Sequence, residues 1–144
     1  MQSNKIRNLI LLVGFLSFIG FLDASYLVIE HYRNGLVPCT IFKGCEQVLS
    51  SRYSEIFGIP VALFGMNFYA MIFISAMVYL EHRRYGLLLW LRALTVGGFL
   101  ASAYFFYLQA FIIKAFCTYC IISATLSVLL LATSFYAVKI NKYE

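Results

Sequence analysis

The sequence predicts an all-α membrane protein, a four-transmembrane-helix bundle with an outer loop that carries a short amphipathic helix. The first observation is composition: the 144-residue chain is 62% hydrophobic and 12% charged, whereas soluble domains are about 45–50% apolar and about 25% charged. A soluble domain of this size leaves too much surface in water to hide such an apolar excess. Composition therefore excludes a soluble enzyme, a disordered chain and a small secreted disulfide scaffold.

The second observation is that four apolar stretches are each long enough to cross a bilayer, which takes about 20 helical residues. They run over residues 8–29, 59–80, 86–113 and 117–138, approximately. Each must satisfy its backbone hydrogen bonds internally, so we expect helices and not strands. No repeat or linker divides the chain, and we expect one transmembrane domain over residues 1–144.

The first stretch resembles a secretory signal peptide only in part. Lys5 and Arg7 precede the apolar run, as they would in a signal. However, Leu22-Asp23-Ala24 lacks the small-x-small cleavage pattern. We therefore expect the first stretch to remain as a span.

Positive charge predicts the orientation of the bundle. The terminal side carries six cations in short segments and the loop side carries four, so the positive-inside rule places both termini in the cytoplasm and residues 30–58 outside. The net charge of +5 is thus a sign of orientation, and we expect no nucleic-acid partner. The six are Lys5, Arg7, Arg83, Arg84, Lys139 and Lys142, and the four are Arg33, Lys43, Arg52 and Lys114.

The long outer loop, residues 30–58, has a helical pattern in its second half. Apolar residues recur at helical spacing over residues 46–57, which predicts a short amphipathic helix against the membrane surface. Gly58 and Pro60 are expected to end it and to begin the second span. Its apolar residues are Val48, Leu49, Tyr53, Ile56 and Phe57.

All four cysteines fall on the predicted outer side. Cys39 and Cys45 lie in the long loop, and Cys117 and Cys120 form a Cys-x-x-Cys motif where the fourth helix begins. The outside of a bacterial cell permits disulfides and the cytoplasm does not. An even number of cysteines there indicates two redox-capable pairs.

The position of Cys-x-x-Cys at a helix start favours thiol chemistry. The free backbone N–H groups and the helix dipole would stabilise a Cys117 thiolate, and Lys114 would add a positive charge nearby. Cys120 would lie roughly 4.5 Å deeper along the helix. One sulfur could then meet an aqueous partner while the other meets a molecule dissolved in lipid.

Two other interpretations of the cysteines compete with a relay. The pairs could be structural disulfides in a non-enzymatic membrane protein. However, a Cys-x-x-Cys disulfide at the membrane edge is easily reduced and therefore stabilises a fold poorly. They could also form a four-thiolate zinc site, but Cys-x5-Cys is wider than the usual ligand spacing. We therefore expect no metal.

Asp23 lies within the first span, towards its outer end. A carboxylate inside a membrane is a candidate functional residue by default. Its role would be polar, with proton delivery to an acceptor in the membrane as the specific hypothesis.

Several motifs in fixed order resemble the vitamin K epoxide reductase (VKOR) family, in its bacterial branch. The likeness extends from Lys5 to Val138, and the order of the cysteine pairs is the reverse of that in the other bacterial family of quinone-linked thiol oxidases. The motifs are Cys39-x5-Cys45, Val48-Leu49-Ser50-Ser51-Arg52-Tyr53, Gly58-Ile59-Pro60, Leu63-Phe64-Gly65, Tyr69 and Cys117-x-x-Cys120.

The resemblance implies roles for particular residues around a quinone pocket. Cys117 and Cys120 match the active-site pair, with Cys120 beside the quinone, and Cys39 and Cys45 match the shuttle pair. Cys39 would exchange with an external partner and Cys45 would bridge to Cys117. Ser51 matches a serine next to the pocket, and the matching motifs add Leu49 and Tyr69 as cofactor-binding residues.

The implied activity is that of a thiol oxidase in the bacterial inner membrane. It would reoxidise a separate thioredoxin-like protein outside the cytoplasm and pass electrons to a quinone of the ubiquinone or menaquinone class, which supports disulfide formation. A reductase with the opposite electron flow and a vitamin K quinone or epoxide reductase are the alternatives. Ala124 and Ile59-Pro60-Val61 stand where vertebrate members have a tyrosine and an asparagine, which argues against epoxide reduction.

Overall fold

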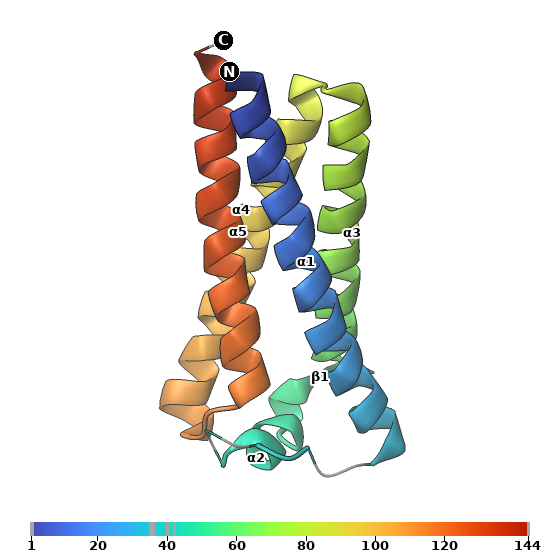
Figure 1. The fold of residues 1–144 in the computed structure, drawn as a ribbon. Coiled ribbons are helices and arrows are strands. Elements are labelled where there is room, and N and C mark those ends of the chain that lie inside the picture. Colours follow the sequence, from blue (N-terminus) through green and yellow to red (C-terminus); the bar gives the residue numbers. More distant parts are fainter. Residues whose placement is uncertain (1, 35–36, 40, 42, 144) are drawn as a thin grey trace.

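The computed structural model describes residues 2–34, 37–39, 41 and 43–143. Within these residues, four helices are long and apolar enough to cross a membrane. They form a bundle with both termini at one end and the long loop across the other (Figure 1). The elements are α1 (Gln2–Arg33), α2 (Cys45–Leu49), the 3₁₀ turn η1 (Arg52–Ser54), β1 (Glu55–Ile56), β2 (Ile59–Pro60), α3 (Val61–His82), α4 (Tyr85–Tyr107), the π-helical turn η2 (Leu108–Ile113) and α5 (Thr118–Lys142).

The predicted four-helix membrane fold is confirmed, with helix ends that differ by a few residues from those expected. The first helix extends well beyond residues 8–29 at both ends, because no glycine or proline interrupts its polar flanks. Pro60, with φ −63°, directly precedes α3, which suits a residue without an N–H donor. At the other end of α3, Arg83 adopts a left-handed conformation, and its N–H donates to the Tyr79 carbonyl at 2.8 Å.

The predicted helix over residues 46–57 is wrong in extent. Only α2 is helical in the α sense, and the chain then forms η1 and a two-stranded antiparallel hairpin in which Glu55 faces Pro60 and Ile56 faces Ile59. The turn residues Phe57 and Gly58 have φ of +53° and +77°, a conformation that a helix cannot contain and a tight hairpin requires. Helical periodicity over this segment was therefore coincidental beyond its first turns.

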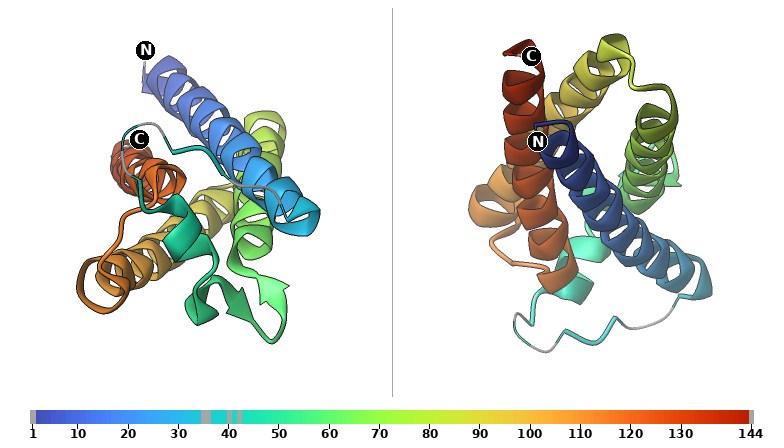
Figure 2. Two further views of the ribbon diagram at one scale, coloured as in Figure 1. Left: turned by 90° about the horizontal axis from the view of Figure 1, so that it is seen from below. Right: turned by 45° about the horizontal axis from the view of Figure 1, so that its top comes forward.

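The helices do not pack equally against one another. α1 lies along both α3 and α5, and α4 packs mainly on α5. Of the four pairs of neighbouring long helices, α3 and α4 have the least contact. Figure 2 shows α2 across the bundle at the loop end. The interface between α3 and α4 is consequently the loosest of these four.

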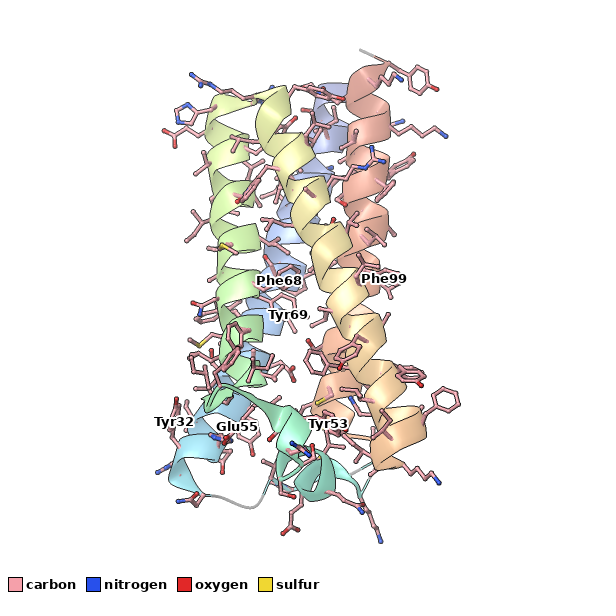
Figure 3. All side chains as sticks on the ribbon, turned by 180° about the vertical axis from the view of Figure 1, so that it is seen from behind. Tyr32, Tyr53, Glu55, Phe68, Tyr69 and Phe99 are labelled. Carbon is pink, nitrogen blue, oxygen red and sulfur yellow. A yellow bond between two sulfur atoms is a disulfide. The ribbon has the colours of Figure 1, made fainter. Side chains whose placement is uncertain are left out.

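Close packing of α1 on α3 depends on Gly20. A Cβ atom at this position would overlap the aromatic ring of Tyr69, which is itself only 2% exposed. Figure 3 shows Tyr69 and its neighbour Phe68 inside the bundle, above the loop end that holds Tyr53 and Glu55. The absence of a side chain at Gly20 thus leaves the space in which the Tyr69 ring lies against α1.

We predict that Gly20→Ala destabilises the protein by about 1–3 kcal/mol, because the added methyl group overpacks the core against Tyr69. The measurement is thermal unfolding in detergent. Gly97→Ala is the matched control. It also replaces a helical glycine, but the added Cβ atom meets nothing within 4 Å. Equal unfolding temperatures for Gly20→Ala and the parent would contradict this view of the packing.

Candidate redox site

The structure gathers all four cysteines at the loop end of the bundle. Cys39 and Cys45 form a disulfide with a Cα–Cα distance of 6.0 Å, while Cys117 and Cys120 are free thiols. The four belong to one apolar cluster. The expected placement of both pairs at the same end is confirmed.

The two pairs are joined by direct backbone contact. Lys43, between the loop cysteines, forms an isolated antiparallel bridge with Cys117. Gly44 makes this approach possible, because a Cβ atom there would lie 2.7 Å from the Phe116 carbonyl oxygen and 2.8 Å from the Phe116 nitrogen. Cys45, the first residue of α2, is 1% exposed beside Cys117, which is fully buried.

Gln109 holds the segment that leads into the Cys-x-x-Cys motif. Its side-chain oxygen accepts a hydrogen bond from the backbone N–H of Cys117 at 3.0 Å, and its own carbonyl accepts one from Ala115 at 3.1 Å. Gln109 is 4% exposed. The sequence marks it only as a polar residue in an apolar helix, and its partner lies across a turn that no periodicity reveals.

The surroundings of Cys117, which precedes the first residue of α5, favour its thiolate. A hydrogen bond from the Cys120 thiol lowers the pKa of Cys117, burial opposes this, and the backbone N–H groups of Cys120 and Tyr119 lower it further. This agrees with the expected effect of a helix start. Lys114 is exposed and is not among the groups that lower this pKa, so its role stays a prediction.

A cavity of about 320 Å³ opens beside Cys120, within the bundle and under the loop. Its volume is in the range of sites that hold small organic ligands. Cys120 lines it and Cys117 does not, so the deeper sulfur faces the cavity and the outer one faces the loop pair. The predicted cofactor-binding residues all line it together: Leu49, Ser51, Tyr69 and Cys120, with Asp23.

Two of these cavity residues differ in how their polar atoms are satisfied. The Tyr69 hydroxyl lies 2.9 Å from the Ser123 carbonyl oxygen and 2.8 Å from the Ser123 hydroxyl, which joins α3 to α5. By contrast, Oδ2 of Asp23 is buried and has no hydrogen-bond partner within the described part of the chain. A carboxyl oxygen in that state is open to a ligand in the cavity.

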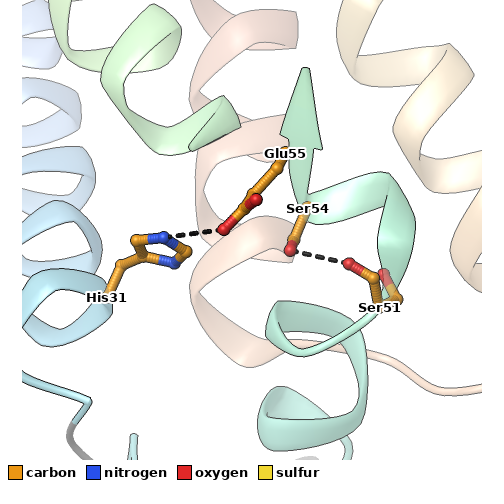
Figure 4. A network of polar contacts seen from close by, with 4 residues as sticks. All are labelled: His31, Ser51, Ser54 and Glu55. Carbon is orange, nitrogen blue, oxygen red and sulfur yellow. Dashed lines mark hydrogen bonds and ion pairs between the residues drawn. The ribbon is translucent and has the colours of Figure 1, made fainter. Parts of the chain in front are cut away.

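Short polar contacts order the loop over this cavity, and Figure 4 shows two of them, His31 with Glu55 and Ser54 with Ser51. His31 at the end of α1 pairs with Glu55 of β1 at 3.0 Å, and Ser54 donates to the Ser51 carbonyl oxygen at 2.7 Å. The Ser51 hydroxyl in turn donates to the Val48 carbonyl oxygen at 2.7 Å. His31 and Ser54 also line the cavity, which the sequence alone did not indicate.

A search of curated proteins finds no match to the sequence. The model of the vitamin K epoxide reductase family matches residues 11–135, a segment that contains all four cysteines and the cavity residues named above. Since this match covers most of the chain, the protein belongs to the vitamin K epoxide reductase family.

Proposed function

We propose that the protein is a quinone-linked thiol–disulfide oxidoreductase that reoxidises a separate thioredoxin-like protein. Family membership supports an oxidoreductase with quinone-linked chemistry. The observation that carries the proposal is the arrangement of the two cysteine pairs. The backbone of the loop pair contacts the backbone of the Cys117/Cys120 pair, and Cys120 is the cysteine that lines the cavity. A cavity surrounded mainly by apolar and aromatic side chains suits a quinone ring.

The relay begins at the loop pair. A thiolate of the reduced partner attacks Cys39, which forms a mixed disulfide and releases Cys45 as a thiolate. Cys45 attacks Cys117 of an oxidised Cys117–Cys120 pair and releases Cys120. The second thiol of the partner then attacks the mixed disulfide and releases Cys39 as a thiolate. Cys39 attacks Cys45, which reforms the Cys39–Cys45 bond and frees Cys117. Each exchange follows from a thiolate within reach of a disulfide sulfur.

These steps leave the partner oxidised and Cys117 and Cys120 as thiols, the same pairing that the structure has. A bound quinone supplies the oxidising power by taking up two electrons and two protons. The chain's part is to hold Cys120 at the cavity, keep Cys117 away from it, and exclude water with α2 and the loop. Loss of the electrons closes the Cys117–Cys120 bond and readies the pair for the next exchange.

The orientation that we propose puts this end of the bundle outside the cytoplasm of a bacterial inner membrane, where partner disulfides persist. The excess of cations at the terminal end of the bundle supports this orientation.

We expect Cys120→Ala to abolish partner-dependent quinone reduction and to leave Cys117 as a thiol, because no Cys117–Cys120 disulfide can form for Cys45 to attack. Quinone absorbance and non-reducing peptide mass spectrometry measure the two effects. Ile122→Ala, an exposed position on the same helix, is the control. Structural disulfides in a non-enzymatic protein would leave the parent itself without turnover.

Gly44→Ala is expected to slow electron transfer between the pairs on the order of 10- to 100-fold, because it separates Cys45 from Cys117. Single-turnover quinone reduction from a pre-reduced Cys117/Cys120 pair should remain at the parental rate. The matched control is Gly86→Ala, where a Cβ meets nothing within 4 Å. Unchanged multiple-turnover rates in Gly44→Ala would show that the pairs need no close approach.

We further propose that Asp23 delivers a proton to the bound quinone, since its unpartnered oxygen lines the cavity with Cys120. Asp23→Asn keeps the shape but cannot release a proton, and turnover should fall about 10²- to 10⁴-fold. Quinol formation is followed across pH. Ser25→Ala, whose hydroxyl bonds the Phe21 carbonyl away from the cavity, is the control, and a parental rate in Asp23→Asn would remove this role.

A further inference from the structure

A second groove, of about 510 Å³, lies on α4 and α5 and shares no lining residue with the cavity beside Cys120. It lies towards the end of the bundle that holds the termini, since Lys142 is the last residue of α5. Its lining residues are Arg92, Ala132, Phe135, Tyr136, Val138, Lys139, Lys142 and Tyr143.

The groove collects positive charge, and none of the described residues that line it carries a counter-charge. Three cations, Arg92, Lys139 and Lys142, line it, and no acidic residue does. In the part of the chain that the structure describes, none of the three forms a salt bridge with a carboxylate. Such a concentration of cations attracts anions.

Arg92 is the unusual member because it lies inside a membrane-spanning helix, whereas Lys139 and Lys142 lie in the last turn of theirs. It lies seven residues after the start of α4, which is roughly 10 Å along the helix. Its guanidinium carbon is 4.0 Å from the centre of the Phe135 ring. A cation at this depth is costly in lipid unless it reaches the headgroup layer or meets an anion there.

Hydrogen bonds between the two helices fix the shape of the groove. The Thr95 and Ser134 hydroxyls lie 2.8 Å apart, and the Thr95 hydroxyl also donates to the Arg92 carbonyl at 2.9 Å. Ser134 directly precedes Phe135. Arg92 of α4 is therefore held against the turn of α5 that leads to Lys139.

We propose that this groove binds the headgroup phosphate of an anionic phospholipid. Arg92, Lys139 and Lys142 would contact the phosphate, and the acyl chains would run along Phe135 towards the centre of the bilayer. Basic pockets between membrane helices bind acidic headgroups in this way. The bound lipid would link α4 to α5 on the lipid-facing surface of the bundle.

The aromatic residues favour a lipid over a soluble anion. Phe135 and Tyr136 are 41% and 57% exposed on the flank of a membrane-spanning helix, where hydrocarbon chains can cover them. A free phosphate ion would gain nothing from these rings. This inference does not depend on the chemistry of the cysteines.

The test measures lipid binding by the purified full-length protein with native mass spectrometry and thermal unfolding. Phosphatidylglycerol, phosphatidylcholine and inorganic phosphate are the three probes. We expect phosphatidylglycerol alone to bind and to raise the unfolding temperature. The triple variant R92Q/K139Q/K142Q should lose about a hundredfold in affinity, as expected from the removal of three headgroup contacts.

The matched control is K5Q/R7Q/R84Q, which removes the same charge from the same end of the bundle but not from the groove. It should bind phosphatidylglycerol like the parent. Equal loss in both triple variants, or equal binding of phosphatidylcholine, would overturn the proposal, as would saturation by inorganic phosphate. If the groove triple variant does not fold, exposed Lys139→Gln alone must still weaken phosphatidylglycerol binding, and parental binding in that variant would refute the site.

Discussion

The backbone contact between the loop cysteines and the segment before α5 is the constraint on which the site depends. Lys43 pairs with Cys117, and the missing side chain of Gly44 lets the two segments meet. Without that contact, two cysteine pairs separated by about half the sequence would share only the same end of a bundle. With it, Cys45 and Cys117 pack in one apolar cluster, where thiol exchange requires little chain movement.

A second consequence is that the two sulfurs of the Cys-x-x-Cys motif have different surroundings. Gln109 fixes the backbone of Cys117, so the helix begins with that sulfur under the loop and turns the Cys120 sulfur to the cavity. The helix itself thus provides the division between a thiol that faces the loop and a thiol that faces the cavity. The loose packing between α3 and α4 leaves space for a ring beside the deeper sulfur, where a tightly packed bundle would have none.

The sequence predicted the parts of this arrangement that depend on local patterns. Hydropathy identified the spans, and cysteine spacing identified both pairs. The resemblance to the family supplied Leu49, Ser51 and Tyr69, which line one cavity with Cys120. Sequence prediction failed over residues 46–57, because the positive φ angles of Phe57 and Gly58 reverse the chain where apolar spacing suggested a helix. It also could not pair His31 with Glu55 or Gln109 with Cys117, since both contacts join separate elements and arise only from tertiary packing.

The polar groups within the spans divide into those that the protein satisfies itself and those that it leaves open. Thr95 with Ser134, and Tyr69 with Ser123, close hydrogen bonds between helices, as an apolar solvent demands. In the described residues, Oδ2 of Asp23 closes none. Because an unpaired buried carboxyl oxygen costs free energy, and Asp23 faces the same cavity as Cys120, this cost is best explained by a ligand that supplies the missing partner when it binds. The proposed electron path through the sulfurs and the unpaired Asp23 oxygen therefore lead to the same cavity, which neither would define alone.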